Sequence, residues 1–429
     1  MNTPIFIVGV LLSLIFLGMP ISYSLGVTAL ATLVKLDYIS FLGIMPQRMF
    51  GGLNSYAIMA MPFFMLAGEV MNRTGITNSL IKLAEMLVGW IRGGLAHVNI
   101  LTSMLFAGLT GSAVSDTAAL GSILIPSMVE RGYSKGFSAA VTAASSIIGP
   151  IIPPSIIMVV YGSLMNVSIA GMFAAGIIPG ILLGTSIMIL SYFISIKKDY
   201  AEKRPIPSFK EVIIALKESI PALIMPLIIL GGILGGIFTP TEAAAVAVLY
   251  AVIIGLFMRK LKVKDFWKII QDTATSQGMI LIILSCAAIL AWVLASEQIP
   301  QSIANFMISI TGNKLVMLFL INILLLVFGM FMDITAALII LAPILGPIAI
   351  GLGVHPLHFG IIMTINLTMG LMTPPLGACL FVACGITKIS LKVIAKDILP
   401  FIIVEIAILF LITYIPQLVM FIPNLLGYN

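Results

Sequence analysis

Long apolar runs recur along the whole chain, and they limit its possible folds more than any other feature. A helix that crosses a bilayer needs roughly 20 consecutive, mostly apolar residues. Only 9% of the 429 residues are charged, whereas a soluble domain carries about 25%. The sequence therefore predicts an all-α polytopic membrane protein. The candidate spans are 5–19, 20–34, 53–71, 138–164, 168–196, 219–237, 240–258, 275–295, 357–387 and 398–420.

Basic residues lie between the spans, which accounts for the net charge of +6. This pattern is typical of topology determinants and gives no reason to expect a nucleic-acid partner. Residues 197–218 form the most hydrophilic stretch and carry a basic excess. We interpret them as a cytoplasmic linker between two halves. Counting spans outward from this linker places both termini on the opposite, periplasmic side of a multi-pass protein.

The two halves contain similar motifs in the same order. Each half has an aspartate followed ten residues later by a proline, and further on a glycine precedes a Pro-Pro pair. This order predicts a duplication, with repeats at 1–196 and 219–429. The matched motifs are Ser115-Asp116-Thr117-Ala118-Ala119 with Met332-Asp333-Ile334-Thr335-Ala336, and Gly149-Pro150-Ile151-Ile152-Pro153-Pro154 with Gly370-Leu371-Met372-Thr373-Pro374-Pro375.

The base of the first aspartate element carries Arg131 and Lys135, but the matching place at 351–358 has no lysine or arginine. Basic residues favour the cytoplasmic side, so the two elements should face opposite sides of the membrane. The sequence thus predicts inverted-topology repeats, a common plan in transporters.

Each repeat contains two interrupted apolar segments. Residues 96–130 are broken by a polar, Gly-rich stretch at 108–116, and residues 314–351 are broken at 329–333. One continuous helix of that length would overshoot the bilayer, so we predict two re-entrant helical hairpins. The Pro-Pro pairs interrupt 138–164 and 357–387, which we predict to be broken transmembrane helices. Irregular backbone at membrane depth must be buried in protein or line a wet cavity.

Asp116 and Asp333 each precede a helical run, and both suit an N-cap. A purely capping role is the alternative, but neutral Ser or Asn would cap equally well without the charged-insertion cost of about 2.5 kcal/mol. We therefore predict a site for substrate or cation at the two tips. The hydroxyls of Thr117 and Thr335 lie next to it in sequence.

Each Pro-Pro pair removes amide donors and should leave carbonyls free at 147–151 and 367–371. Such carbonyls can coordinate Na⁺; a simple kink without a ligand is the alternative. Ser145 and Asn366 add oxygens at matched places, eight residues before each pair. The candidate sodium ligands are Gly111, Ser145, Ile148, Gly149, Pro153, Gly329, Asn366, Gly370, Thr373 and Pro374.

Four other acidic residues lie at or near predicted span ends, where an interfacial position is expected. Glu242 in addition follows Thr239-Pro240 in a pattern typical of a helix start. These residues are Glu69, Glu242, Glu297 and Glu405.

With these residues in view, the chain resembles the large membrane subunit of tripartite ATP-independent periplasmic (TRAP) transporters. The resembling segments cover both halves. The most specific matches are Gly111-Ser112-Ala113-Val114-Ser115-Asp116-Thr117-Ala118-Ala119 and Gly236-Ile237-Phe238-Thr239-Pro240-Thr241-Glu242-Ala243. One departure is Asn54, where the family often has an acidic residue.

The resemblance implies uptake of an organic acid anion, such as sialic acid or a C4-dicarboxylate, across a bacterial inner membrane. It implies two or more coupling Na⁺ ions, no organic cofactor, and an elevator movement of the hairpin-bearing domain. It also implies two partners, a small four-helix membrane subunit and a periplasmic substrate-binding protein. The residues carried over as substrate-binding are Ser112, Ser115, Asp116, Asp333 and Thr335.

Other readings stay open at this point. A stand-alone Na⁺/dicarboxylate symporter would share the hairpins but need no binding protein. An intramembrane aspartyl enzyme would need Asp116 and Asp333 within about 3 Å of each other. A passive channel would carry flux without Na⁺. The sequence has no phosphate-binding loop of the Gly-x4-Gly-Lys-[Ser/Thr] type, and it does not identify the acid.

Overall fold

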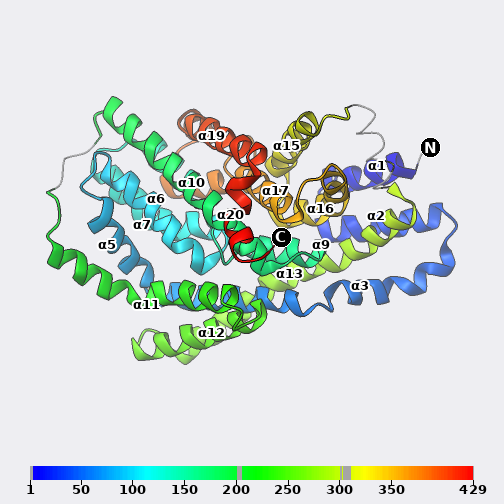
Figure 1. Ribbon diagram of the computed structural model, residues 1–429, viewed down its shortest axis with the longest axis horizontal. Coiled ribbons are helices and arrows are strands. Elements are labelled where there is room, and N and C mark those ends of the chain that lie inside the picture. Colours follow the sequence, from blue (N-terminus) through cyan, green and yellow to red (C-terminus); the bar gives the residue numbers. More distant parts are fainter. Residues whose placement is uncertain (1–2, 201–204, 300–301, 303–310, 429) are drawn as a thin grey trace.

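The computed structural model describes residues 3–200, 205–299, 302 and 311–428, and these ranges contain helices and no strand (Figure 1). This confirms the predicted all-α class. Residues 201–204 of the predicted linker, and 300–301, 303–310 and 429 of the predicted second repeat, lie outside the described residues, as do residues 1–2.

The helices of the first half, up to the predicted linker, are listed here with their bounds: α1 (Thr3–Phe16), α2 (Ile21–Lys35), η1 (Ile39–Ile44), α3 (Met45–Leu53), η2 (Tyr56–Met59), α4 (Ala60–Arg73), α5 (Ile76–Val88), α6 (Gly94–Thr110), α7 (Ala113–Glu130), α8 (Lys135–Ser146), α9 (Ile156–Met165) and α10 (Ile169–Lys197).

Those of the second half are α11 (Phe209–Leu234), α12 (Pro240–Phe257), α13 (Val263–Ser296), α15 (Lys314–Phe331), α16 (Ile334–Gly351), α17 (Pro356–Gly370), α18 (Ala378–Thr387), α19 (Leu391–Tyr414) and α20 (Pro416–Leu425).

Six of the described helices are long and apolar enough to cross a bilayer: α10, α11, α12, α13, α15 and α16. Two further spans are possible if bent pairs are counted as one each, namely Ser40–Leu53 with Tyr56–Arg73, bent by 58°, and α19 with α20, bent by 60°. The predicted runs 5–19 and 20–34 form helices of only 14 and 15 residues.

Two helix starts are set by capping chemistry. Ser208 and Glu211 form a reciprocal capping box at the start of α11, so this helix begins inside the segment predicted as linker. Thr239 and Glu242 do the same at α12, with Pro240 at its first position. The prediction of a helix start at Glu242 is confirmed.

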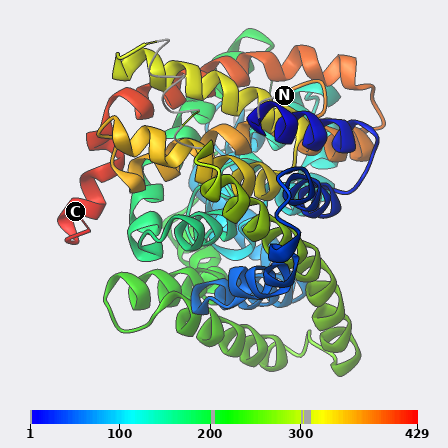
Figure 2. The same ribbon diagram turned by 90° about the vertical axis from the view of Figure 1, so that its right-hand side faces the viewer.

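The described helices pack in two groups. An outer group contains α1–α5 and α11–α13, in which α4 packs on α12, α11 on α5, and α13 on α2 and α3. A central group contains α6–α10 and α15–α20, in which α8 packs on α7 and α19, and α15 on α17. In Figure 1 the outer group lies around the central group, with α5 at the left, α11 and α12 along the bottom and α1–α3 at the right; Figure 2 shows α11 and α12 again at the bottom.

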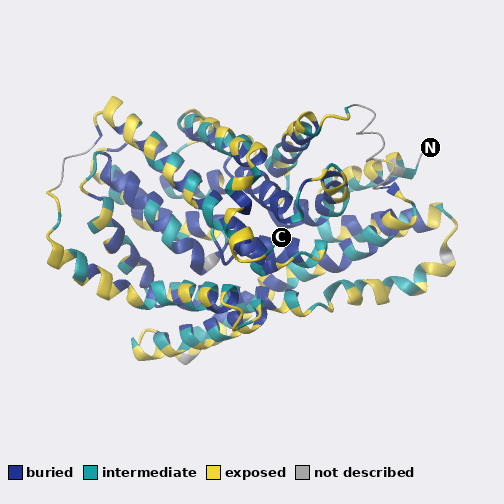
Figure 3. Cartoon of the chain, in the orientation of Figure 1, coloured by how far each residue is buried: buried dark blue, intermediate teal, exposed yellow. Residues whose placement is uncertain are grey.

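The core lies in the central group. Every residue from Gly136 to Ser146 in α8 and from Leu357 to Gly370 in α17 is buried. Figure 3 shows this as dark blue in the middle of the molecule, while the outer faces of α11 and α12 are largely exposed. A helix that is buried on all sides is one that other helices surround. α8 and α17 therefore form the centre of the molecule, where α8 packs against α6 and α7, and α17 packs against α15 and α16.

Each predicted hairpin segment forms a pair of helices with a short break, and the re-entrant course of the two pairs remains a prediction. The first break lies at Gly111 and Ser112, between α6 and α7, and the second at Met332 and Asp333, between α15 and α16. Gly111 has φ +60°, a left-handed conformation that favours glycine. The broken helices are α8 with α9 and α17 with α18, each interrupted around its Pro-Pro pair. The division into two inverted repeats remains a prediction.

Candidate functional site at the hairpin tips

The first tip is organised by Ser112. Its backbone is extended and its side-chain oxygen accepts a hydrogen bond from the Ser115 N–H at 3.5 Å, so Ser112 is the N-cap of α7. The prediction that Asp116 caps this helix is therefore wrong. Asp116 lies further on, in the first turn of α7, where its carboxyl group is near the positive end of the helix dipole.

Asp116 is fully buried, and its carboxylate packs against Gly149 in the first broken helix. A Cβ built at Gly149 would overlap that carboxylate. The absence of a side chain at position 149 is thus what lets the charged group approach the break. The Thr117 hydroxyl donates to the Ala113 carbonyl at 2.8 Å and is engaged within its own helix.

The second tip is organised by Asp333, as predicted. It is the N-cap of α16, and Oδ1 accepts hydrogen bonds from the N–H groups of Thr335 at 2.9 Å and Ala336 at 3.4 Å. Asp333 is exposed, whereas Thr335 is buried. A charged cap that keeps solvent contact can accept a further ligand on its second oxygen.

The caps show how the two elements correspond. Ser112 and Asp333 both cap, so the residue equivalent to Asp333 is Ser112 and not Asp116. The distance from the aspartate to the Pro-Pro pair is 37 residues from Asp116 to Pro153 and 41 from Asp333 to Pro374, but counted from the two caps the distances are equal. A single offset of 221 residues relates Gly108 to Gly329, Ser112 to Asp333, Pro126 to Pro347, Ser145 to Asn366, Gly149 to Gly370 and Pro153 to Pro374.

Both tips face one cavity of about 170 Å³. Both Pro-Pro breaks contribute to its wall, through Pro150 and Leu371, and the outer group closes it with Met65 of α4 and Ile280 of α13. The complete lining is Met65, Gly111, Ser112, Ala113, Val114, Pro150, Ile156, Ile157, Ile280, Asp333, Ile334, Thr335 and Leu371. Four interrupted segments that are far apart in sequence therefore meet at one place.

Behind the first tip, Ser145 belongs to a buried polar network. Its hydroxyl lies 2.9 Å from the Ser103 hydroxyl and 3.3 Å from Asn99 Oδ1. Asn99 in turn donates to the Thr142 hydroxyl at 2.7 Å. The network joins α6 to α8, so it holds the first helix of the hairpin against the broken helix.

The second tip has a matching network. The Asn366 amide donates to Asn322 Oδ1 at 2.6 Å and to the Ile362 carbonyl at 2.8 Å, and Asn322 donates to the Thr413 hydroxyl at 3.1 Å. Asn366 Oδ1 is buried and has no hydrogen-bond partner among the described residues. Buried polar atoms are nearly always satisfied, so this oxygen is an available acceptor.

The expectation of free carbonyls holds only partly. In the second break, four of the five carbonyls from 367 to 371 accept hydrogen bonds, at Thr368, Met369, Gly370 and Leu371. The chain turns tightly there, so its own N–H groups reach them. In the first break, Ile148 and Pro150 accept hydrogen bonds. No hydrogen bond to the carbonyls of Ile147, Gly149 and Ile151 occurs in the described residues, so the first break offers more free oxygens to a cation.

The structure brings together some predicted site residues and separates others. Those lining the cavity are Gly111, Ser112, Asp333 and Thr335. Ser115 is exposed and does not line it, and Asp116 is buried behind it. The remaining predicted cation ligands lie in or beside the breaks without lining the cavity: Ser145, Ile148, Gly149, Pro153, Gly329, Asn366, Gly370, Thr373 and Pro374. The Thr373 hydroxyl is engaged with the Met369 carbonyl at 2.7 Å.

Sequence reasoning missed Asn99, Ser103 and Asn322, which stand behind the tips. An i, i+4 pair of polar residues at 99 and 103 in an apolar helix was the available signal.

The interfacial interpretation of Glu405 is also wrong. Glu405 is fully buried in the interior of α19, and neither carboxylate oxygen has a hydrogen-bond partner among the described residues.

Comparison with known proteins identifies the family. The family model described as "Tripartite ATP-independent periplasmic transporter, DctM component" matches residues 8–418. This chain belongs to that family. The sialic acid TRAP transporter large permease protein SiaM of Vibrio cholerae is 40% identical over 420 residues, covering 97% of this chain and 98% of the relative.

Relatives in the same family are named for other acids. The C4-dicarboxylate TRAP transporter large permease protein DctM of Vibrio cholerae is 38% identical, with 97% of this chain and 96% of the relative covered. The isethionate TRAP transporter permease protein DctMQ of Oleidesulfovibrio alaskensis is 42% identical over 410 residues. The match covers 94% of this chain and 64% of that longer protein.

Among solved structures, the YdaH transporter of Alcanivorax borkumensis has a similar fold, with a TM-score of 0.66 at 16% identity over 89% of this chain and 88% of that one.

Because the family model and the curated relatives cover nearly the whole chain, this DctM family member is a multi-pass inner-membrane protein and the large permease of a TRAP transporter. It is a transport protein rather than an enzyme, so the aspartyl-enzyme alternative is wrong.

Proposed function

We propose that this chain imports an organic acid anion together with Na⁺, and that a periplasmic binding protein delivers the acid. A small membrane subunit completes the assembly. The observation that carries the proposal is the convergence of both hairpin tips and both Pro-Pro breaks on one cavity of about 170 Å³. Relatives named for sialic acid, C4-dicarboxylate and isethionate support a carboxylate or sulfonate as the cargo.

The proposed division of labour follows from the two tips. The N-terminus of α7, which Ser112 caps, presents the positive end of its helix dipole to the cavity, and this suits an anionic group. At the N-terminus of α16 the Asp333 carboxylate takes the first N–H groups, and its second oxygen can accept from a hydroxyl or amide of the acid. The cations bind behind the tips. The first break supplies the carbonyls of Ile147, Gly149 and Ile151, and the Asp116 carboxylate packs against Gly149 of the same break. The second break supplies Asn366 Oδ1. Oxygen ligands of these kinds suit Na⁺ at broken helices.

Coupling to Na⁺ supplies enough free energy for accumulation. Each Na⁺ that enters down a potential of about 100 mV releases about 2.3 kcal/mol. Two ions release about 5 kcal/mol, of which a monovalent anion entering against the same potential takes up about 2.3 kcal/mol. The remainder of about 2.3 kcal/mol corresponds to an accumulation of roughly 50-fold because about 1.4 kcal/mol is tenfold, and the Na⁺ concentration gradient adds to it. The movement we propose is an elevator, in which the central group slides past the outer group. α13 packs on α16, and the residues of both helices at this place are leucines, isoleucines, alanines and Pro343, an apolar surface that suits sliding.

Uptake into proteoliposomes tests the proposal. The assembled transporter is supplied with its binding protein, a Na⁺ gradient and, in turn, N-acetylneuraminate, succinate and isethionate. We expect uptake of one acid that requires both Na⁺ and the binding protein. Uptake that continues without the binding protein would indicate a stand-alone symporter, and uptake without Na⁺ would indicate a channel.

Asp333→Asn is the sharpest variant, because Asn caps a helix about as well as Asp but carries no charge. The helix start should therefore survive while the charged site is lost, and we expect uptake to fall about tenfold or more. Asp333→Ala removes cap and charge together and should also destabilise the protein by about 1 kcal/mol. Full uptake activity in the Asp333→Asn variant would show that Asp333 acts only as the N-cap of α16 and does not bind the acid or a cation.

A further inference from the structure

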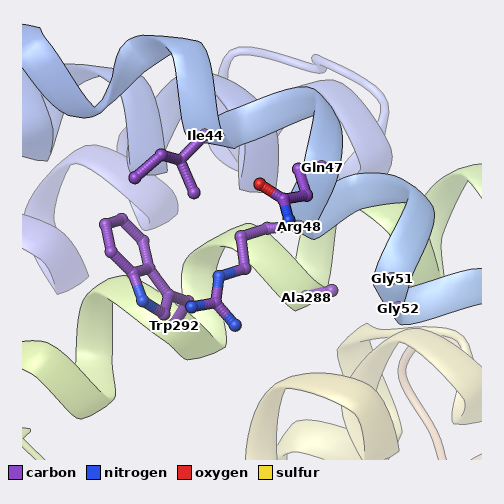
Figure 4. Close-up of a pocket in the computed structure, with 7 residues that line it drawn as sticks. All are labelled: Ile44, Gln47, Arg48, Gly51, Gly52, Ala288 and Trp292. Atoms are coloured by element: carbon purple, nitrogen blue, oxygen red, sulfur yellow. The ribbon is translucent and has the colours of Figure 1, made fainter.

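A second cavity lies between α3 and α13 in the outer group and shares no lining residue with the hairpin-tip cavity. It has a volume of about 530 Å³. Figure 4 shows its lining: Ile44, Gln47, Arg48, Gly51, Gly52, Ala288 and Trp292. One cation, one amide and one indole ring therefore surround a space large enough for a small organic molecule.

The cavity is built by close approach of the two helices. A Cβ on Gly52 would overlap the Ala288 side chain, so the glycine lets α3 lie directly on α13. The Ser285 hydroxyl donates to the Met49 carbonyl at 3.3 Å and fixes the same contact. The result is that Arg48 reaches over the Trp292 ring, with the guanidinium carbon 5.5 Å from the ring centroid.

The Arg48 guanidinium is positioned but not neutralised. Among the described residues no carboxylate forms an ion pair with it and no acceptor takes its N–H groups, and none of the seven lining residues is acidic. The Trp292 ring lies on one side of the guanidinium group, with its centroid 5.5 Å from the guanidinium carbon. An oriented guanidinium with a free edge is suited to a bidentate contact with a planar or tetrahedral oxyanion.

The place of this cavity along α13 relates it to the hairpin tips. Ile280 of α13 lines the tip cavity and Trp292 lines the Arg48 cavity. Twelve residues of helix separate them, or about 18 Å. The tip cavity has no lysine or arginine in its lining, so Arg48 supplies a positive charge on the same helix that the tip cavity itself lacks.

The α13 surface near Arg48 also contacts the second hairpin. Ala287, Leu290, Ala291 and Leu294 of α13 meet Ile339, Ile340 and Pro343 of α16 in an apolar contact. If the central group slides along this contact, the tip that carries Asp333 changes its distance from the Arg48 cavity. A residue on the outer group could then hold the acid before the tips receive it.

We propose that the Arg48–Trp292 cavity is a waiting site for the acid, in which Arg48 binds the carboxylate or sulfonate group and Trp292 covers the body of the molecule. This second binding site adds a step to the proposed function, and it rests on that function for the identity of the transported acid. The site belongs to the outer group, so it is separate from the moving tip cavity.

Tryptophan fluorescence of the full chain in phosphatidylcholine nanodiscs tests binding without transport. Succinate, N-acetylneuraminate and isethionate are titrated in turn. We expect at least one to quench Trp292, so the quench disappears in Trp292→Phe and remains in Trp267→Phe. Arg48→Met should weaken the apparent affinity by about tenfold or more, which is the range expected for a lost charge-assisted hydrogen bond. Arg48→Lys should lie between, because lysine lacks the fork.

Lys35→Met is the matched control. Lys35 also stacks on an aromatic ring, with Nζ 4.1 Å from the Phe6 centroid on a neighbouring helix, and its loss should leave the quench unchanged. Equal affinities in Arg48→Met and the wild type would overturn the proposal, as would no quench by any of the three acids. A quench that requires added phosphatidylglycerol would also overturn it, because the site would then hold a lipid headgroup.

Uptake by the assembled transporter gives a second readout. Arg48→Met should raise the half-saturating acid concentration about tenfold, whereas Lys35→Met should not. An unchanged half-saturating concentration in Arg48→Met would count against the waiting site. If the wild type shows no Na⁺-dependent uptake of any acid, the proposed function fails, while the fluorescence titration still decides whether Arg48 binds the anion.

Discussion

Gly370 sits where the second broken helix crosses the second hairpin. A Cβ at this position would overlap the main chain of Gly329, meeting its Cα, its carbonyl carbon and its oxygen. These are backbone atoms of α15 and cannot rotate away as a side chain would. Gly370→Ala should therefore force α15 and α17 apart, and overpacking of this kind costs about 1–3 kcal/mol. We expect the upper end of that range, because both partners are main chain.

Gly278→Ala is the matched control, since this glycine also lies inside a helix, α13, and nothing lies within 4 Å of its Cβ position. Alanine in a compatible helical position stabilises by about 0.4–1 kcal/mol. The same chemical change should thus lower the thermal midpoint at 370 and keep or raise it at 278.

The assay is thermal unfolding of each purified variant in one detergent, followed by intrinsic fluorescence, together with Na⁺-dependent uptake. We expect Gly370→Ala to melt lower than the wild type and to lose most of its uptake, because the crossing supports the second tip. If Gly370→Ala melts at or above the wild-type midpoint, the crossing is not as tight as the reasoning requires.

Three further changes test individual groups. Asp116→Ala should abolish Na⁺-dependent uptake while the protein still inserts in the membrane; normal uptake would remove Asp116 from the cation site. Ser145→Ala removes a partner of Ser103 and should destabilise by about 1–3 kcal/mol and raise the half-saturating Na⁺ concentration, which a Na⁺ titration measures. Glu405→Leu replaces a buried carboxyl without a hydrogen-bond partner by an apolar side chain and should raise the thermal midpoint; a lower midpoint would show that the carboxyl is bound in the assembly.

Most helices and the positions of both breaks at the hairpin tips could be predicted. The reason is that the length of an apolar segment and the free-energy cost of a charged residue in a bilayer can be read from the chain itself. The register of the first tip could not be predicted in the same way. Matching Asp116 to Asp333 was reasonable by residue type, but two serines compete for the cap, and Ser112 takes it. Proline spacing held the better signal, since Pro126 and Pro347 lie at equal distances from the two caps.

Other parts of the site depend on distant contacts that sequence spacing does not contain. The burial of Glu405 results from the helices packed around α19. The occupied carbonyls of the second break result from the tightness of its turn, with the Leu371 carbonyl reaching the Cys379 N–H at 3.0 Å. The Arg48 cavity likewise exists only because Gly52 meets Ala288 across two helices.

The two tips that share one cavity are capped by side chains of different charge. Ser112 contributes a hydroxyl group, and Asp333 contributes a carboxylate. An anion between them faces the Asp333 carboxylate at one wall and the positive end of the α7 dipole at the other, so we expect its acidic end to lie toward α7. The two tips, which are similar in backbone but different in their caps, would therefore set the orientation of the transported anion in the cavity.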